Sequence, residues 1–378
     1  MSPEPGAGGA AVKQQEPLKP YTTFEIGGPA RYFVRAATAE DFRAALALAT
    51  REELPLFILG GGSNILVSDR GYEGVVAHPV LGGIEVAHED SARVTLEVNA
   101  GETWDDVVAF AVERNWWGIE NLSHIPGQAG AALVQNIGAY GQQISDVLES
   151  AEVMDATTGV VRVLAAEECA LGYRRSIFNT SARGKLIILR LRLRLGKRAR
   201  PHLGYPDLKA HFAAREAPEA SLPEIRRAVI TIRDRKFPFP REERGGNAGS
   251  FFKNLSLTEE EFAGLRGKIE RNFPAPVVER LDDVRSRFAS SGRIKIPTAF
   301  LIEICGLKGH RIGGAQVNET QPLVLLNQGG ATAEDVLTLA RHVRHTVYEH
   351  TGMTISIEPE LVGFTEQEVA DLLGGSER

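Results

Sequence analysis

Two stretches of small residues offer the first candidates for chemistry in this sequence. The first is Gly-Gly-Gly-Ser-Asn at residues 60–64. Successive glycines remove side chains where the backbone must approach something closely, and their N–H groups can form a concavity that binds an anion. A plain turn is the commoner explanation of a glycine triplet. The segment matches neither a dinucleotide-binding G-x-G-x-x-G nor a P-loop.

The second stretch runs from Ile125 to Gly141 and is rich in glycine and alanine. A flat ligand or a pyrophosphate could lie against such a backbone. Close packing of helices or loops explains the same composition equally well. The upstream glycine turn favours the ligand, because two bare backbone surfaces can hold it together.

Polar side chains that could act on a substrate occur at three places. Arg174 follows Tyr173 and could bind a carboxylate with two hydrogen bonds, although surface arginines are usually only solvated. Ser250 follows a glycine, where a serine usually just makes a turn, and no G-x-S-x-G elbow surrounds it. Glu358 and Glu360 share one face of an expected strand, and a buried carboxyl beside an arginine could serve as an acid.

These candidates lie on or beside recognisable elements. Residues 32–35 read as a strand, and Thr38 caps a helix with Asp41 in the capping-box position. The apolar run 54–59 reads as a strand that continues directly into the glycine turn. Further strands and helices are expected at 94–98, after Thr103, over the hairpin 152–164, and at 185–195, 221–236, 297–304, 323–326, 332–350 and 355–362.

In the expected strand 185–195, leucines alternate with arginines, which predicts one buried and one wet face. From about residue 221 the pattern of the amino-acid sequence changes. We expect an α+β protein with two packed units for a cofactor and a third for a substrate.

The composition excludes several classes of protein. A formal net charge of −6 argues against a broad basic surface for nucleic acid. The two cysteines and nine histidines form no disulfide framework and no zinc-binding spacing, so no metal is expected. No apolar run reaches membrane-spanning length. The start lacks the apolar core of a signal peptide, so we expect residues 1–18 to be a disordered tail and the protein to be cytoplasmic.

Taken in order, the motifs resemble one family, the UDP-N-acetylenolpyruvoylglucosamine reductases (MurB) of type I. The resemblance covers residues 19–364, nearly the whole folded chain. No single motif is specific, but six or more in the right order are. The segments that carry it are Tyr21 to Phe24 with Gly27-Gly28, then 60–66, 125–141, 172–178, 247–254, 301–309 and 358–361.

The resemblance implies the two-subdomain FAD-binding fold of the vanillyl-alcohol oxidase type plus a third α+β domain that binds substrate. It divides the chain into FAD-binding subdomains at 19–82 and 83–215 and a substrate-binding domain with the closing strand at 216–378. It implies FAD contacts from the two small-residue stretches, at Gly60, Gly61, Gly62, Ser63, Asn64, Ile125, Pro126, Gly127, Gly130, Ala131, Gln135, Asn136, Gly138, Ala139 and Tyr140.

Three catalytic positions carry over by motif: Arg174, Ser250 and Glu360. In the implied reaction NADPH reduces non-covalently bound FAD and leaves, and the enolpyruvyl UDP-sugar takes its place. Arg174 and a protonated Glu360 stabilise the developing enolate, and Ser250 protonates the carbanion carbon. Substrate contacts are implied at Tyr173, Tyr205, Lys236, Lys253, Asn254 and Gln321, with Tyr205 on a loop near 202–212 typical of type I members.

The sequence departs from the family pattern at several positions. His124 stands where glycine usually precedes Ile-Pro-Gly, Leu133 where proline is common, and Asn318 where histidine is frequent. The closing strand reads Glu-Leu-Val-Gly in place of the commoner Glu-Val-Arg.

Two other functions compete with this interpretation. An FAD oxidase of the wider fold family could carry flavin covalently bound to His124. A nucleotide-sugar binding protein without chemistry would need none of Arg174, Ser250 and Glu360. The preference for NADPH and a monomeric state are expected from the resemblance alone.

Overall fold

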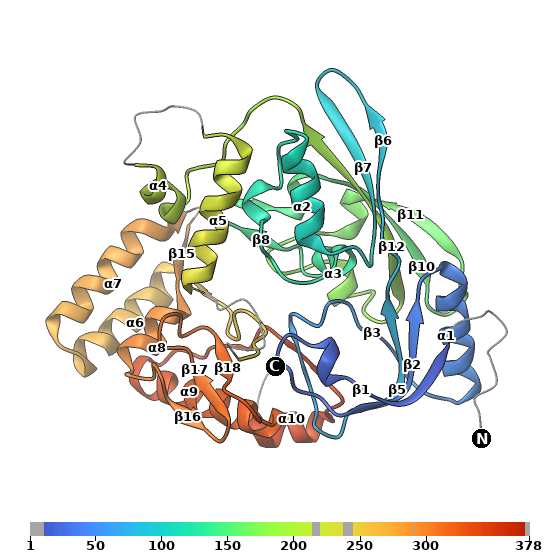
Figure 1. Ribbon diagram of the computed structural model, residues 1–378. Coiled ribbons are helices and arrows are strands. Elements are labelled where there is room, and N and C mark those ends of the chain that lie inside the picture. The colour runs from blue at the N-terminus through green and yellow to red at the C-terminus, as the bar shows by residue number, and fades with distance from the viewer. Residues whose placement is uncertain (1–10, 214–219, 237–244, 291, 375–378) are drawn as a thin grey trace. The chain divides into compact units, whose positions relative to one another are not determined.

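The computed structural model describes residues 11–213, 220–236, 245–290 and 292–374. The chain forms two compact units, neither of which is one continuous segment (Figure 1). Unit 1 comprises the described residues up to Glu16, Pro29–Gly62 and Tyr72–Arg235. Unit 2 comprises Pro17–Gly28, Ser63–Gly71 and the residues from Lys236 onward.

The first sheet of unit 1 has the strand order β1-β2-β5-β3. Its strands are β1 (Val12–Pro17), β2 (Pro29–Ala36), β5 (Tyr72–Pro79) and β3 (Leu56–Ile58). β5 pairs in parallel with both β2 and β3. Helix α1 (Ala39–Arg51) packs on the sheet and begins with the predicted capping box, in which the Asp41 N–H donates to Thr38 Oγ1. The short strand β3 leads directly to Gly60.

The second sheet of unit 1 is antiparallel, with the order β11-β10-β12-β7-β6. Its strands are β6 (Ile84–Glu89), β7 (Arg93–Asn99), β10 (Leu148–Asp155), β11 (Val161–Ala165) and β12 (Leu186–Gly196). The predicted alternation of β12 is confirmed, because Leu191, Leu193 and Leu195 are buried while Arg192 and Arg194 are exposed. The predicted hairpin is β10 and β11.

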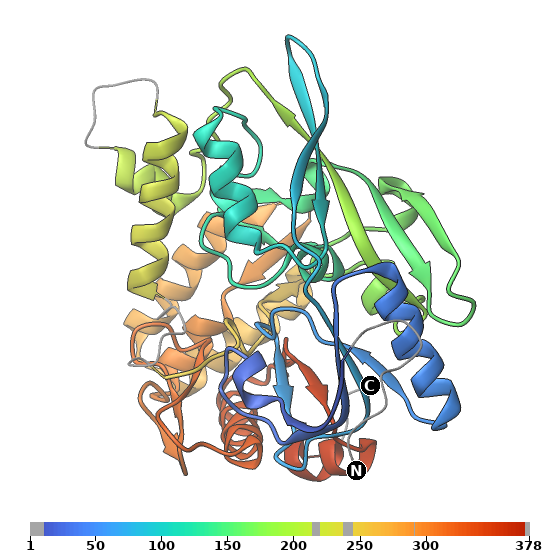
Figure 2. The same ribbon diagram turned by 45° about the vertical axis from the view of Figure 1, so that its right-hand side comes forward.

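Helices and short strands complete unit 1. They are α2 (Trp104–Glu113), α3 (Ala129–Val134), α4 (Pro206–Phe212) and α5 (Leu222–Lys236, whose last residue begins unit 2), with β8 (Gly138–Ala139), β9 (Gln142–Gln143) and the 3-10 turns Glu120–Leu122, Ile144–Asp146, Ala166–Cys169 and Ile177–Asn179. Figures 1 and 2 both place α5 beside α2. Their apolar faces share one core with the inner face of the second sheet.

Unit 2 is built from small sheets and a long helix. The sheets have the orders β13-β15-β14, β16-β17-β18 and β19-β4. Their strands are β13 (Leu255–Leu257), β14 (Ala289–Ser290), β15 (Arg293–Ile296), β16 (Arg311–Ile312), β17 (Ala315–Val317), β18 (Leu325–Asn327), β4 (Ile65–Val67) and β19 (Glu360–Val362). The helices are α6 (Glu259–Asn272), α7 (Ala275–Phe288), α8 (Thr298–Ile304), α9 (Ala333–Thr351) and α10 (Glu366–Leu373), and one 3-10 turn spans Lys19–Tyr21.

The core of unit 2 joins residues from both ends of the sequence. Phe24, Ile26 and Leu66 are buried in the same cluster as the apolar face of α9. The last strand, β19, pairs in parallel with β4, nearly three hundred residues earlier, with Glu360 opposite Ile65. Short early segments therefore supply essential parts of a unit made mostly by the C-terminal third of the chain.

Three expectations need correction. The predicted tail is wrong for residues 12–17, which form β1 at the edge of a sheet, and Leu18 is buried. Pairing with β2, together with the packing of Val12 against the core, orders this largely polar segment. Residues 1–10 lie outside the described part. The closing strand is confined to Glu360–Val362 and does not begin at residue 355.

The predicted domain boundary at residue 216 also differs from the observed units. Helix α5 belongs almost entirely to unit 1, because Leu222, Ile225 and Val229 pack into the core that α2 and the second sheet share. The change in sequence texture near residue 221 therefore precedes the change of unit by a whole helix.

No helix in the described ranges is both long and apolar enough to cross a bilayer. Within the same ranges, no group of three or more metal-binding side chains occurs. Cys169 and Cys305 are free thiols, and burial raises the pKa of each to about 11.

A candidate cofactor cradle and candidate catalytic side chains

The glycine turn and the Gly/Ala-rich segment lie against each other within unit 1. A Cβ atom on Gly61 would stand 2.6 Å from the Gly127 Cα, and one on Gly60 would stand 3.0 Å from the Ala131 Cβ. Both distances are below ordinary contact, so glycine is required at Gly61 and favoured at Gly60. Gly62 has a φ of 60°, a conformation that glycine adopts without strain.

A buried acceptor lies at this junction with no hydrogen-bond partner among the described residues. The Gln128 amide nitrogen donates to the Pro79 carbonyl at 2.9 Å, while its Oε1 atom is buried and unsatisfied. A Cβ on Gly60 would stand 3.5 Å from that oxygen. A ligand N–H or hydroxyl at the glycine turn would remove the desolvation cost of this orphaned acceptor. The bare backbone and the open acceptor fit a dinucleotide cofactor.

Not every small residue of the second stretch faces this junction. Gly130 is buried against Ala100, whose Cβ would lie 2.8 Å from a Gly130 Cβ. Gly130 thus fits the packing explanation. The predicted cofactor-binding residues of this stretch that remain partly exposed are Ile125, Pro126, Gly127, Ala131, Gln135, Gly138 and Ala139.

Asn136 connects the Gly/Ala-rich segment to the turn that carries Arg174. It is buried, and its Nδ2 donates to the Gly172 carbonyl at 2.9 Å. Gly172 and Arg175 exchange two backbone hydrogen bonds, which close a tight turn around the intervening pair. Asn136 therefore has a structural contact that explains its position without a cofactor.

Arg174 occupies that turn in a left-handed conformation, with a φ of 52°. Such backbone strain is uncommon outside glycine and is tolerated where the surroundings fix it. Here the Asn179 side chain donates to the Arg174 carbonyl at 3.1 Å, and Ser176 Oγ donates to the Val134 carbonyl at 2.7 Å. Tyr173, beside it, is exposed. The turn fixes the main chain of Arg174, whose side chain is half-buried with its Nε atom enclosed.

Two of the predicted tyrosines contact each other. The rings of Tyr140 and Tyr205 meet edge-on with centroids 5.3 Å apart. Burial raises the pKa of Tyr140 to about 12, and burial, together with the nearby charges of Asp207 and Tyr173, raises the pKa of Tyr205. Both phenols stay neutral at physiological pH and can donate hydrogen bonds. Tyr205 precedes α4 directly, as expected for the loop.

Sequence reasoning missed Arg233, a half-buried cation of α5 in unit 1. Burial lowers its pKa from the ordinary value for arginine. The neighbouring phenol of Tyr140 opposes that shift, and Arg174 adds to it. The signal was present in the sequence, because Arg233 follows Ile225 and Val229 at intervals of four, on the stripe that faces the core.

Helix α5 fixes the loop before Ile125 through four polar side chains. Arg226 donates twice to the Asp105 carboxylate of α2, at 2.6 and 2.8 Å. Asp105 also accepts from the His124 N–H at 2.5 Å, and the His124 carbonyl accepts from Arg233 Nε at 2.9 Å. The His124 ring lies 3.2 Å from the Asp234 carboxylate. His124 itself has a φ of 60°, which explains why a glycine suits this position.

In unit 2, backbone pairing holds the Ser250 segment against the strand of glutamates. Phe252 bridges Ile357, the Glu358 N–H donates to the Phe251 carbonyl at 2.8 Å, and the Lys253 N–H donates to the Ser356 carbonyl at 2.9 Å. Phe251 and Phe252 are fully buried. Ser250 is half-buried and follows Gly249, whose φ of 70° turns the chain. The aromatic pair thus anchors a serine at the end of a tight turn.

Asn64, the last residue of the glycine turn, forms hydrogen bonds with the segment of unit 2 that carries the two glutamates. The Glu360 N–H donates to the Asn64 carbonyl at 3.0 Å, and Asn64 Nδ2 donates to the Glu358 carbonyl at 3.4 Å. Unit 2 therefore brings together Asn64, Ser250 and the two glutamates, which are remote in sequence. Glu358 and Glu360 are both half-buried, but only Glu360 belongs to β19.

The predicted substrate contacts of unit 2 have diverse surroundings. Lys253 is exposed, and its carbonyl accepts from Thr298 Oγ1 at 2.6 Å. Asn254 accepts from the Thr298 N–H at 3.1 Å and so caps the first turn of α8. Gln321 is half-buried in the turn before β18, and Lys236 is the half-buried last residue of α5.

Comparison with known proteins supports a cofactor at the junction of residues 60–62 and 127–131, which we call the cradle. The family model described as "FAD binding domain" matches residues 30–164, which include both small-residue stretches. A second model, described as "UDP-N-acetylenolpyruvoylglucosamine reductase, C-terminal domain", matches residues 240–362. The fold and the cradle thus define an FAD-binding protein of the α+β class.

Relatives extend this similarity to nearly the whole chain. UDP-N-acetylenolpyruvoylglucosamine reductase of Pseudomonas putida is 38% identical over 92% of this chain and 98% of its own length. The protein of the same name from Chromobacterium violaceum is 40% identical over 90% of this chain and 96% of its own. The crystal structure of the Thermus caldophilus reductase (MurB) aligns with a TM-score of 0.62, at 25% identity, over 93% of this chain and 98% of that chain. The chain belongs to the UDP-N-acetylenolpyruvoylglucosamine reductase (MurB) family.

Proposed function

We propose that this chain reduces the enolpyruvyl group of UDP-N-acetylglucosamine enolpyruvate to give UDP-N-acetylmuramate, with NADPH as electron donor and non-covalent FAD as carrier. The reaction belongs to the cytoplasmic synthesis of peptidoglycan precursors. The observation that carries the proposal is similarity to reductases of this name along 92% of the chain. The bare cradle at residues 60–62 and 127–131 supports it independently.

FAD, when bound, supplies a two-electron carrier that accepts hydride from NADPH and delivers it to the vinyl methylene carbon of the substrate. The proposed FAD contacts are the two small-residue stretches. Gly61 and Gly127 keep the backbone bare, and the open Gln128 acceptor receives a donor of the cofactor. Gly130 is better explained by packing against Ala100.

Arg174, Glu360 and Ser250 are the proposed catalytic side chains. Negative charge develops on the substrate carboxylate and the adjacent carbon once hydride has been added. Hydrogen bonds from the Arg174 guanidinium and the Glu360 carboxyl stabilise that charge. The Ser250 hydroxyl then donates the proton that completes the new C–H bond. The hydrogen-bonded turn supports this role, since it fixes the main chain from which the Arg174 side chain extends.

The proposed substrate contacts are Tyr173, Tyr205, Lys236, Lys253, Asn254 and Gln321. The two lysines suit the diphosphate of a UDP-sugar. The raised pKa of Tyr205 keeps its hydroxyl available as a hydrogen-bond donor. We also propose that the protein works as a monomer, which the molar mass from light scattering would test.

The bonds around His124 argue against the oxidase alternative. Its ring nitrogen contacts Asp234, and its main chain is bound by Asp105 and Arg233, so the residue is explained by the α5 loop contacts. The flavin should therefore be released on acid precipitation. Yellow colour that remained with the precipitate would favour a covalent oxidase.

One titration tests the whole proposal. The purified protein should show a flavin spectrum that bleaches when NADPH is added without oxygen. Addition of the enolpyruvyl UDP-sugar should then restore the oxidised spectrum in a stoichiometric step. A colourless folded protein would favour the binding-protein alternative, and reduced flavin that the UDP-sugar cannot reoxidise would contradict the proposed substrate.

A further inference from the structure

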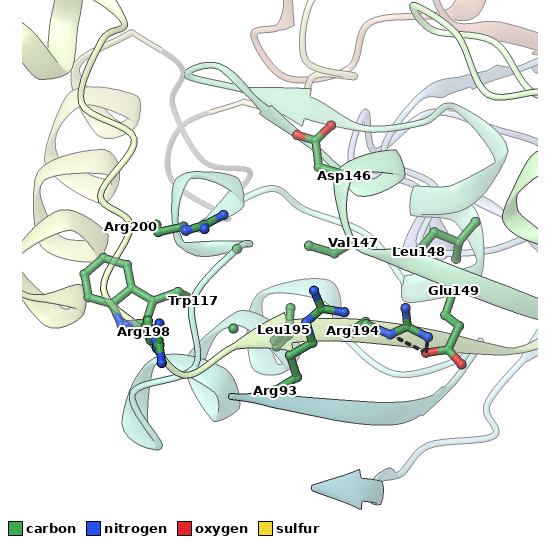
Figure 3. A pocket seen from close by; sticks show the side chains of 12 residues that line it. Arg93, Trp117, Asp146, Val147, Leu148, Glu149, Arg194, Leu195, Arg198 and Arg200 are labelled. Atoms are coloured by element: carbon green, nitrogen blue, oxygen red, sulfur yellow. Dashed lines mark hydrogen bonds and ion pairs between the residues drawn. The ribbon is translucent and has the colours of Figure 1, made fainter. Parts of the chain in front are cut away.

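A cavity of about 400 Å³ opens in unit 1 at the end of β12 where that strand leaves the second sheet (Figure 3). Its walls come from the start of β7, the residues after α2, the start of β10 and the segment after β12. The lining residues are Arg93, Trp117, Gly118, Asp146, Val147, Leu148, Glu149, Arg194, Leu195, Gly196, Arg198 and Arg200. None of them is among the proposed cofactor or substrate contacts.

The arginines of β12 outside this cavity are neutralised by carboxylates. Arg190 and Arg192 both pair with Glu97 of β7, Arg190 at 2.9 Å. Lys197, just past the strand, pairs with Glu89 at 2.6 Å. Each of these three cations thus has a carboxylate partner, although Arg190 and Arg192 share one.

Within the cavity only one of the four arginines is compensated by a carboxylate of the described residues. Arg194 pairs with Glu149 at 2.9 Å, and the Asp146 carboxylate accepts the Gln143 N–H at 3.0 Å. Arg93, Arg198 and Arg200 have no side-chain hydrogen bond or ion pair to any described residue. Figure 3 shows Arg198 and Arg200 on the Trp117 side and Arg93 beside Arg194.

Four apolar side chains form part of the cavity lining. Trp117, Val147, Leu148 and Leu195 are all buried. Arg93, Arg198 and Arg200 are exposed, so water and salt screen their charges, but because all three line one cavity they can attract a common anion. A guanidinium binds phosphate with two parallel hydrogen bonds.

We propose that this cavity binds a small molecule that carries at least two phosphate groups. With Arg194 and Glu149 paired, Arg93, Arg198 and Arg200 contribute three positive charges and Asp146 one negative charge, so a net charge of about +2 remains, which a diphosphate balances better than a monoanion does. Asp146 and Glu149 on the wall restrict where the phosphates can lie. The volume is within the range of small-ligand pockets. The ligand is either inorganic pyrophosphate or a nucleoside diphosphate, which share this chemistry.

The test uses the FAD-loaded full-length protein and calorimetric titration with pyrophosphate and, separately, with ADP. The variant Arg93→Gln/Arg198→Gln/Arg200→Gln should weaken binding of the ligand at least tenfold. The matched control is Arg162→Gln, which removes an exposed strand arginine of β11 outside the cavity and should change affinity less than twofold. An unchanged flavin spectrum and turnover would show that each variant is folded.

Each possible result either supports or overturns the proposed site. Binding of either ligand that the triple variant loses and the control retains supports the site, and the tighter of the two ligands identifies its source. Failure of the unmodified protein to bind both ligands overturns the proposal. Equal loss in the triple variant and the control would also overturn it, because general charge would then explain the binding.

Discussion

Ser250 is the residue on which the second half of the proposed reaction depends. Ser250→Ala removes the proton donor and should slow reoxidation of reduced flavin by the UDP-sugar by about 10²–10⁴-fold. Reduction by NADPH does not use this hydroxyl and should stay close to normal. Stopped-flow absorbance of the two half-reactions measures both rates.

The control for this variant is Ser256→Ala, six residues later, at the exposed position of β13. It should leave both half-reactions unchanged. If Ser250→Ala slows the NADPH step as strongly as the sugar step, Ser250 is needed for the site's structure and is not the proton donor.

His124 stands where the family usually has glycine, and hydrogen bonds to its main chain hold the backbone conformation that glycine would adopt. His124→Gly should keep the flavin bound, because glycine adopts the φ of 60° freely. His124→Val should destabilise the protein by about 1–3 kcal/mol, since a β-branched residue strains in this region. Thermal unfolding followed by flavin fluorescence compares the two. An equal loss of thermal stability in both variants would show that the contact between the His124 ring and Asp234 contributes more to stability than the backbone conformation does.

At the residue scale, the sequence predicts side chains that occur in motifs and misses those that act through burial. Arg174, Ser250 and Glu360 were found because each stands in a recognisable segment. Arg233 was not, although it interrupts the buried stripe of α5. Its importance depends on which loop that helix packs against, and no local pattern encodes that.

The glycine turn is an element whose geometry excludes side chains. Gly61→Ala would place a methyl group 2.6 Å from the Gly127 Cα. The backbone must then separate, so we expect a loss of stability of about 1–3 kcal/mol and release of FAD during purification. Gly264→Ala on α6 is the control, because a Cβ there meets nothing within 4 Å. It should be neutral or stabilising by about 0.5–1 kcal/mol. If the Gly61→Ala variant retained FAD, the cradle would not be part of the FAD-binding site.

The ion pair between Asp105 of α2 and Arg226 of α5 makes the stability of unit 1 depend on pH. Burial raises the pKa of Asp105, but hydrogen bonds from Arg226 and the His124 N–H outweigh it, and the net pKa is lowered. The carboxylate therefore stabilises the fold at pH values above its ordinary pKa of about 3.9, and this contribution is lost as the pH falls through the lower folded value.

Asp105→Asn should cost about 2 kcal/mol at neutral pH, because it leaves Arg226 without its partner in a partly buried place. The difference in thermal midpoint between the variant and the unmodified protein should be constant above about pH 5 and shrink below about pH 4. A difference that did not vary with pH would assign the loss to packing.

At the element scale, periodicity and capping predicted much of the fold. The capping box at Thr38, the alternating strand β12 and helix α9 all agree with the structure. β1 was missed because an edge strand can be held largely by its main chain, and α6 and α7 because charged residues dominate their sequences and few of their side chains are buried.

The whole molecule is interleaved, since the chain passes between units after residues 16, 28, 62, 71 and 235. A fragment that starts at residue 236 lacks Phe24, Ile26 and Leu66 of its core and the β4 partner of β19. We expect this fragment alone to show no cooperative unfolding in urea, and co-expression with residues 1–235 to restore a folded, yellow protein. A cooperative transition of the lone fragment would contradict this view of the core.

The pairing of β19 with β4 also sets an order on biosynthesis. A nascent chain emerging from the ribosome has every strand of unit 1 by residue 196, but β4 must wait until residue 362 has been translated before its partner arrives. During that interval Phe24, Ile26 and Leu66 have no finished core to enter. Slowed elongation near the C-terminus would prolong this exposure and make the newborn protein depend on chaperones.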